Sequence, residues 1–188
     1  MKFILGSKSP GRRQILTKMG YKFTVLDPNI DEKSIRSDIP ERLVSALAYT
    51  KAMALLPKIN EAAILITSDQ VVRCNSKILE KPKDQNEARE FLHMYMRYPA
   101  ETMTAVTVTN TLNKKQESGI DIAKIWFHPI PENMIEQIAN QEYVVTCAGG
   151  FSLDDLLLKK YIAKIEGTSD SITGLPIELT RQLILKVS

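Results

Sequence analysis

Cysteine is scarce in this chain, and the two that are present, Cys74 and Cys147, lie far apart with no Cys-x-x-Cys spacing. That scarcity argues against a disulfide framework or a zinc site and fits a reducing, cytoplasmic setting. The chain also lacks any apolar run near the roughly 18 residues that would span a bilayer. Its first residues predict a strand, not the basic and then apolar pattern of a signal peptide. We therefore expect a soluble cytoplasmic protein with no membrane partner.

A concentrated charge of one sign is missing as well. The chain has 25 Lys and Arg against 22 Asp and Glu, which gives a net charge of +3. Proteins that bind nucleic acid usually carry a concentrated basic patch, so we expect no nucleic-acid partner. Low-complexity tracts and internal repeats are also absent. At 188 residues the chain is long enough for one sizeable core, and we expect a single domain over residues 1–188.

The segment Leu5-Gly6-Ser7-Lys8-Ser9-Pro10-Gly11-Arg12-Arg13 follows a short apolar run and predicts a strand, a tight loop and then a helix. Ser9 is a good N-cap, and Pro10 suits the first helical position. Arg12 and Arg13 fall in the first turn, where cations oppose the helix dipole. An anion bound in front of the helix would offset that cost. A solvated basic loop explains the same residues, and this segment alone leaves both interpretations open.

Strand and helix patterns alternate along the rest of the chain. A helix is predicted from Pro40 to about Leu56, and Lys51 interrupts its apolar stripe. The continuous apolar run 62–67 predicts a strand buried on both faces that ends at the polar residues 68–70. Strands are also expected at residues 23–26, 103–127 (a pair) and 161–165, and a hairpin at 71–80. Three further helices are expected at 84–98, 131–138 and 176–184, and a polar loop at 168–174. We expect an α/β fold with a mixed twisted sheet and flanking helices.

Charged side chains occur where an open α/β sheet usually places its ligand site. Asp69 follows the buried strand, Lys51 points along the inner face of its helix, and Lys81 precedes a proline at a strand end. Each has a plainer explanation: a turn aspartate, a snorkelling lysine and a loop charge. Glu32, in an acidic loop, would by itself be solvated. Taken together with the first loop, the set suits a polyphosphate with a divalent metal.

Four separated segments carry a family resemblance. They are Leu5 to Arg13, Ser68-Asp69-Gln70-Val71-Val72, Ile78-Leu79-Glu80-Lys81-Pro82 and Gly174-Leu175-Pro176. In this order and spacing they resemble the Maf family of nucleoside triphosphate pyrophosphatases, over essentially the whole chain. The resemblance implies a fold shared with the inosine triphosphatase group, a mixed α/β structure with two lobes around a cleft. It also implies hydrolysis of the α–β phosphoanhydride, a Mg²⁺ or Mn²⁺ cofactor and a homodimer.

The resemblance assigns roles to individual residues. The matching positions are Ser7, Arg12, Glu32, Lys51, Asp69 and Lys81. Asp69 matches the proton acceptor, and Ser7 and Arg12 match residues that contact phosphate. Lys51 and Lys81, with Arg12, would neutralise the triphosphate and the leaving pyrophosphate, while Glu32 and Asp69 would hold the metal. Whether Asp69 accepts the proton or chiefly binds metal stays open.

Three positions decide the substrate in this family, and here they are Gly11, Gln70 and Asp154. The dTTP/UTP branch carries Arg, Thr and Gln there, with a Lys-Ala-Gly segment. Gln70 and the segment Cys147-Ala148-Gly149 instead resemble the branch that acts on 7-methyl-GTP, which usually has Trp in place of Gly11 and Glu in place of Asp154. A carboxylate at 154 accepts from the guanine edge and complements a cationic base, whereas Gly11 removes an aromatic stacking partner.

We therefore expect a 7-methyl-GTP pyrophosphatase, and three alternatives remain. The same site could hydrolyse dTTP and UTP. The chain could be a cell-division (septum) regulator with a vestigial nucleotide site, against which the intact set of charged residues argues. Fold analogy alone would suggest an enzyme that removes deaminated purine nucleotides.

Overall fold

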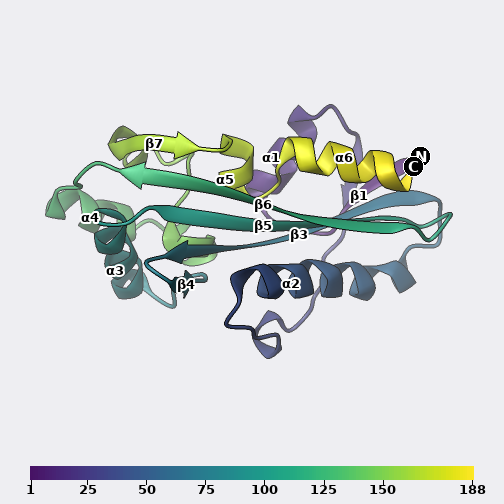
Figure 1. Ribbon diagram of the computed structural model, residues 1–188, viewed down its shortest axis with the longest axis horizontal. Helices are drawn as coiled ribbons and strands as arrows, with labels where there is room; N and C mark the ends of the chain where they lie inside the picture. The colour runs from purple at the N-terminus through teal and green to yellow at the C-terminus, as the bar shows by residue number, and fades with distance from the viewer. The chain divides into compact units, whose positions relative to one another are not determined.

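The computed structural model describes residues 1–188, and the chain forms two compact units. Unit 1 comprises residues 1–70, 104–121 and 173–188, and unit 2 comprises residues 71–103 and 122–172. The sheet has seven strands in the order β2-β1-β3-β5-β6-β7, with β4 paired to β3 (Figure 1). Strand β1 is parallel to β2 and β3, whereas β4 and β7 run antiparallel to their partners. The predicted mixed α/β fold is confirmed.

Unit 1 contains strands β1 (Lys2–Leu5) and β2 (Phe23–Val25), helices α1 (Pro10–Lys18), α2 (Pro40–Leu55) and α6 (Ile177–Val187), and parts of the three long strands β3 (Ala63–Cys74), β5 (Ala100–Asn110) and β6 (Gln116–Phe127). Helix α2 covers one face of its strands, and α1 and α6 cover the other (Figure 1). None of the helices is long and apolar enough to cross a membrane.

The core of unit 1 follows the two-residue period of its strands. Towards α1 and α6 the packed residues are Leu5, Ile64, Ile66, Leu16 and Leu183. Towards α2 they are Ile4, Ala63, Leu65, Ala52 and Leu55. Neighbouring strand residues alternate between these faces because successive side chains of a strand point to opposite sides. Since both faces are covered, the apolar run in β3 is continuous, as the sequence predicts.

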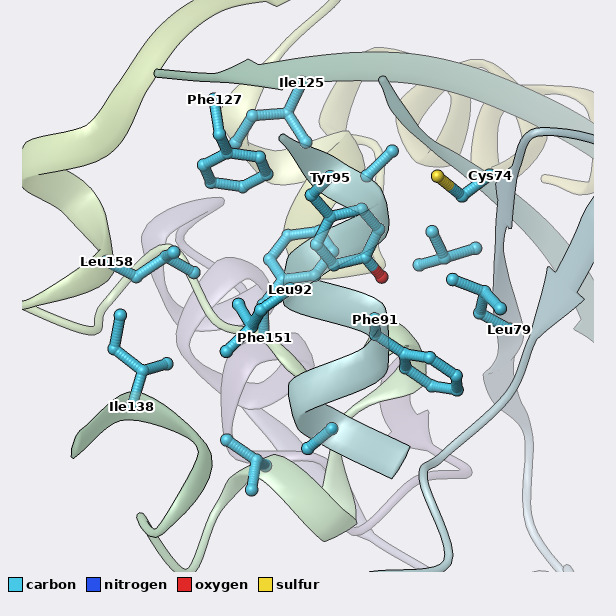
Figure 2. Close-up of a cluster of buried hydrophobic side chains, with 14 of the residues drawn as sticks. Cys74, Leu79, Phe91, Leu92, Tyr95, Ile125, Phe127, Ile138, Phe151 and Leu158 are labelled. Atoms are coloured by element: carbon cyan, nitrogen blue, oxygen red, sulfur yellow. The ribbon is translucent and has the colours of Figure 1, made fainter. Parts of the chain in front are cut away.

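Unit 2 contains strands β4 (Lys77–Leu79) and β7 (Ile162–Glu166), helices α3 (Gln85–Tyr95) and α4 (Glu132–Ala139), and the remaining parts of β3, β5 and β6. An aromatic cluster lies at the centre of its core (Figure 2). The ring centroid of Tyr95 lies 5.7 Å from that of Phe127 and 5.5 Å from that of Phe151. Buried aromatic rings of this size contribute much of the apolar area of a small core.

Strand β3 is longer than the sequence predicts. The expected strand ends before residues 68–70, but the structure has one strand of 12 residues that includes them. Ser68 and Asp69 stay in the strand, buried, because partners inside unit 1 satisfy their polar atoms: the Ser68 hydroxyl donates to the Gly174 carbonyl at 3.0 Å. The β-branched Val71 and Val72 then continue the extended backbone. The expected strand end at residues 68–70 is therefore wrong, and so is the alternative that Asp69 is a turn residue.

The expected polar loop at 168–174 contains a short helix, α5 (Ser169–Thr173). The side chain of Thr168 caps this helix by accepting from Ser171 N at 3.4 Å, and the Thr168 carbonyl accepts from Ile172 N at 3.2 Å. One turn of helix has too few residues for a hydrophobic period, so the pattern could not reveal it.

Candidate active site

A buried lysine lies between two carboxylates in unit 1. Lys51 is on the inward stripe of α2, four residues from both Leu47 and Leu55, and is only 5% exposed. Its Nζ pairs with Glu32 Oε1 at 2.6 Å and donates a short hydrogen bond to Asp69 Oδ1. A buried ammonium is tolerated only where opposite charge and hydrogen bonds offset its lost hydration. The snorkelling alternative for Lys51 is therefore wrong.

Three different elements bring this group together. Helix α2 supplies Lys51, strand β3 supplies Asp69, which is 7% exposed, and a 3-10 turn at Glu32–Ser34 supplies Glu32. The Asp31 side chain caps that turn by accepting from Lys33 N at 3.1 Å. The Glu32 side chain is the most exposed of the three, at 41%. Solvent or a ligand thus reaches the group from the Glu32 side.

Arg12 ties the first loop to β3 and to the segment before α6. Ser9 caps α1 as predicted, accepting from Arg12 N at 3.4 Å, so Arg12 falls in the first turn. Its Nη1 donates to the Ser68 carbonyl at 2.7 Å and to Ser7 Oγ at 3.3 Å. Its Nε donates to the Gly174 carbonyl at 2.9 Å. The guanidinium is thereby oriented by three acceptors on separate segments.

The pKa of Arg12 reflects both its burial and its acidic neighbours. Burial lowers the pKa of its guanidinium, while the negative charges of Asp69 and Glu32 act in the opposite direction. An arginine keeps its charge in proteins, so Arg12 and Lys51 place two cations beside two carboxylates. Preorganised cations of this kind stabilise phosphate oxygens. Arg13, by contrast, is exposed.

Gly11 and Gln70, two of the three positions at which the family resemblance places substrate choice, also lie in unit 1. A Cβ atom at Gly11 would lie 2.6 Å from Thr173 Cγ2 and 3.4 Å from the Thr173 carbonyl, so any side chain there forces a neighbour to move. Gln70 follows Asp69 on β3, and its Nε2 donates to Thr104 Oγ1 at 2.7 Å.

The other expected site residues belong to unit 2. Lys81 is exposed and lines a hollow of about 380 Å³ with residues of β4 and α3. Burial raises the pKa of the Cys147 thiol, while a hydrogen bond with Thr146 and the nearby charge of Lys81 lower it. Asp154 is exposed.

Asp155, next to Asp154, is a structural residue that sequence reasoning missed. It is only 7% exposed and accepts from the Tyr143 hydroxyl, from Gln141 Nε2 at 2.7 Å and from the backbone N–H of Leu157 at 2.7 Å. Burial, followed by the hydrogen bond to Asp155, raises the pKa of Tyr143. No signal in the sequence separates two adjacent aspartates, because the side-chain partners that select Asp155, Gln141 and Tyr143, come from another segment.

Residues 2–187 match the family described as Maf-like protein. This chain belongs to the Maf family. A 7-methyl-GTP pyrophosphatase of Dictyostelium discoideum is 39% identical over 98% of this chain and 96% of that protein. A dTTP/UTP pyrophosphatase of Vibrio vulnificus is 32% identical over 97% of each chain. The match to the family confirms the resemblance carried by the four sequence segments.

Among solved structures, a nucleoside-triphosphatase (dITP/XTP pyrophosphatase) of Mycobacterium abscessus aligns with 97% of this Maf-family chain and 91% of its own, at 14% identity and a TM-score of 0.45.

Proposed function

We propose that this Maf-family protein hydrolyses the α–β phosphoanhydride of a nucleoside triphosphate, with 7-methyl-GTP as its preferred substrate, to the monophosphate and pyrophosphate. One observation carries the proposal: buried Lys51 holds Asp69 and Glu32 at a point that Arg12 also flanks. The arrangement combines cations for phosphate oxygens with carboxylates that accept protons or bind metal. The Dictyostelium relative, named a 7-methyl-GTP pyrophosphatase, supports the choice of base.

Each residue has a role in this reaction. Asp69 accepts the proton of the attacking water. Arg12 and Lys51 neutralise charge that develops on the phosphates, which is the main way in which enzymes accelerate phosphoryl transfer. Ser7 Oγ, which already accepts from Arg12, contacts a phosphate together with the N-terminus of α1. Lys81 is assigned to the phosphates by family resemblance only.

A divalent metal is part of the proposal, and the residues present fit one. Glu32 and Asp69 supply hard carboxylate oxygens that converge on Lys51 Nζ. No third Asp, Glu, His or Cys joins them in a group of three. Mg²⁺ is commonly held by one or two carboxylates plus substrate phosphates, so two suffice. A bound Mg²⁺ or Mn²⁺ would lower the pKa of the attacking water and polarise the α-phosphate.

The choice of 7-methyl-GTP rests on Gln70, on Cys147-Ala148-Gly149 and on an acid at 154. Asp154 would accept from the guanine edge and complement the positive charge of a methylated base. Gly11 leaves no aromatic side chain at the position where the branch usually has Trp, so we expect weaker selectivity for a cationic base than an aromatic would give.

A nucleotide panel assayed for pyrophosphate tests the proposal. We expect the highest kcat/KM on 7-methyl-GTP, ahead of GTP, dTTP, UTP and dITP, and loss of activity when EDTA removes Mg²⁺ and Mn²⁺. An equal or higher kcat/KM on dTTP would overturn the choice of substrate. Absence of pyrophosphate from every nucleotide would overturn the enzyme assignment itself.

Three broader features complete the proposal. Residues 1–188 act as one domain, because β3, β5 and β6 contribute to both units and neither unit is a continuous stretch of chain. The protein works in the cytoplasm, where its two free cysteines stay reduced. It forms a homodimer, as the family resemblance implies, which light scattering on the purified protein would test.

A further inference from the structure

The hydroxyl of Tyr95 forms a hydrogen bond that packing of the aromatic ring does not require. Tyr95 ends helix α3 and is 2% exposed, packed between aromatic neighbours in the core of unit 2 (Figure 2). A phenylalanine would fill the same space. The Tyr95 hydroxyl donates to the Gly149 carbonyl at 2.7 Å, a fully buried hydrogen bond. Burial, followed by a smaller effect of Cys74, raises the pKa of Tyr95, which keeps the hydroxyl protonated as a donor.

Both backbone polar groups of Gly149 form hydrogen bonds. Its N–H donates to the Glu80 carbonyl at 2.9 Å, while its carbonyl accepts from Tyr95. Its φ is +71°, and a Cβ atom there would lie 2.6 Å from Val72 Cγ2 and 2.7 Å from Tyr95 Oη. Only glycine meets both conditions, since an L side chain is strained at that φ and would collide with its neighbours.

The hydrogen bond from Gly149 to Glu80 joins one of the four family segments, residues 78–82, to Cys147-Ala148-Gly149, the segment that resembles the 7-methyl-GTP branch. Glu80 immediately precedes Lys81 and Pro82, and a Cβ atom at Gly150 would lie 3.2 Å from Pro82 Cγ. The segment 147–150 therefore packs directly against residues 80–82. The charge of Lys81 also lowers the pKa of the Cys147 thiol, against the larger effect of burial.

We propose that Tyr95 is a positioning residue: its hydroxyl fixes Gly149, and through the Gly149 N–H it fixes residues 80–82 and the place from which Lys81 acts. The effect on catalysis rests on the proposed function, because only there does Lys81 contact phosphate. The restraint that Tyr95 places on the segment 147–150 is inferred from the geometry of unit 2 alone.

The alkylation rate of Cys147 tests whether Tyr95 restrains the segment 147–150, and this test does not depend on enzyme activity. Tyr95→Phe keeps the aromatic ring and removes only the O–H, so we expect the variant to fold like the wild type. Iodoacetamide should alkylate Cys147 at least about threefold faster in this variant, since the freed segment opens more often. Cys74, which is buried, is the internal control in the same peptide map.

Thr102→Val is the matched control variant. Its hydroxyl is also buried in unit 2 and donates to a backbone carbonyl outside residues 147–150, that of Ala123 at 3.3 Å. Cys147 in the Thr102→Val variant should be alkylated at the wild-type rate. Wild-type alkylation of Cys147 in Tyr95→Phe, or the same increase in Thr102→Val, would overturn the proposal.

A double-mutant cycle with Lys81→Gln tests the action through Lys81. We expect Tyr95→Phe to lower kcat/KM on 7-methyl-GTP about threefold or more in the wild-type background and to have no further effect beside Lys81→Gln. The same factor in both backgrounds would refute a role through Lys81. If no nucleotide yields pyrophosphate, the proposed function fails, while the alkylation rates still decide whether Tyr95 holds the segment.

Discussion

Arg12 and Gly174, 162 residues apart in sequence, are joined by a hydrogen bond of 2.9 Å from the guanidinium Nε to the glycine carbonyl. The same carbonyl accepts from the Ser68 hydroxyl. Gly174 has a φ of +102°, a backbone conformation that favours glycine. The family segment at Gly174 thus orients the arginine of the first loop, and Arg12 is fixed before any substrate arrives.

Replacing Arg12 by Lys should separate charge from geometry. Lysine keeps the positive charge but cannot reach the carbonyls of Ser68 and Gly174 with a rigid fork. We expect kcat/KM for pyrophosphate release to fall by about 10²-fold, the usual effect of removing one preorganised donor. Arg13→Lys, in the same turn but exposed, is the control and should keep wild-type kinetics. An Arg12→Lys variant with full activity would show that charge alone suffices.

Asp69→Asn should abolish proton acceptance while keeping the shape of the side chain. Lys51 retains Glu32 as its partner, so the fold should survive. We expect pyrophosphate release to drop by about 10²- to 10⁴-fold, the range that general-base catalysis contributes. The control is Asp27→Asn, whose exposed carboxylate pairs with Lys8. Release at the wild-type rate would refute the mechanism, and a division phenotype that persists without release would favour the regulatory alternative.

Gly11→Ala should destabilise the protein although alanine favours helices. Its Cβ atom would meet Thr173 Cγ2 at 2.6 Å, and overpacking of this kind costs about 1–3 kcal/mol. Chemical denaturation of both proteins measures the change. Thr173→Ser removes that methyl group and should restore most of the lost stability in the double variant. A Gly11→Ala variant as stable as the wild type would show that the Thr173 side chain can move away from the new Cβ atom without lowering the free energy of unfolding.

Glu101 should make stability depend on pH in the acid range. Burial alone would raise its pKa, but hydrogen bonds from Lys124 and Arg73 outweigh that effect, and the pKa lies below its ordinary value of 4.5. A lowered pKa stabilises the folded state above the unfolded-state pKa, and this contribution disappears as the pH falls through the folded-state value. Glu101→Gln should therefore be less stable than wild type at pH 7, and the difference should shrink below about pH 4.5.

Urea unfolding between pH 3 and pH 7 measures this difference. Glu90→Gln, which removes an exposed carboxylate on α3, is the control. A Glu101→Gln deficit that stays constant over the whole range would show that lost packing, not charge, explains it.

The local parts of the site were predictable from the chain. Ser9 and Pro10 start α1 where the capping pattern places them, and Lys51 lies on the buried face because its position falls within the helical stripe. The apolar run 62–67 likewise predicts a strand covered on both faces, and residues 63–69 of β3 are buried. These features depend on neighbours within a few residues, so periodicity and capping chemistry are sufficient to reveal them.

Tertiary structure alone decided the rest. Arg12 meets Gly174, Gly149 is held between Glu80 and Tyr95, and Asp155 is buried while Asp154 is exposed. Each of these outcomes depends on a partner that is distant in sequence. Strand and helix periods state which face of an element is apolar, but they contain no information on which distant backbone carbonyl completes a side chain's hydrogen bonds. That choice is made only when the separate segments pack and every buried polar group must find a partner.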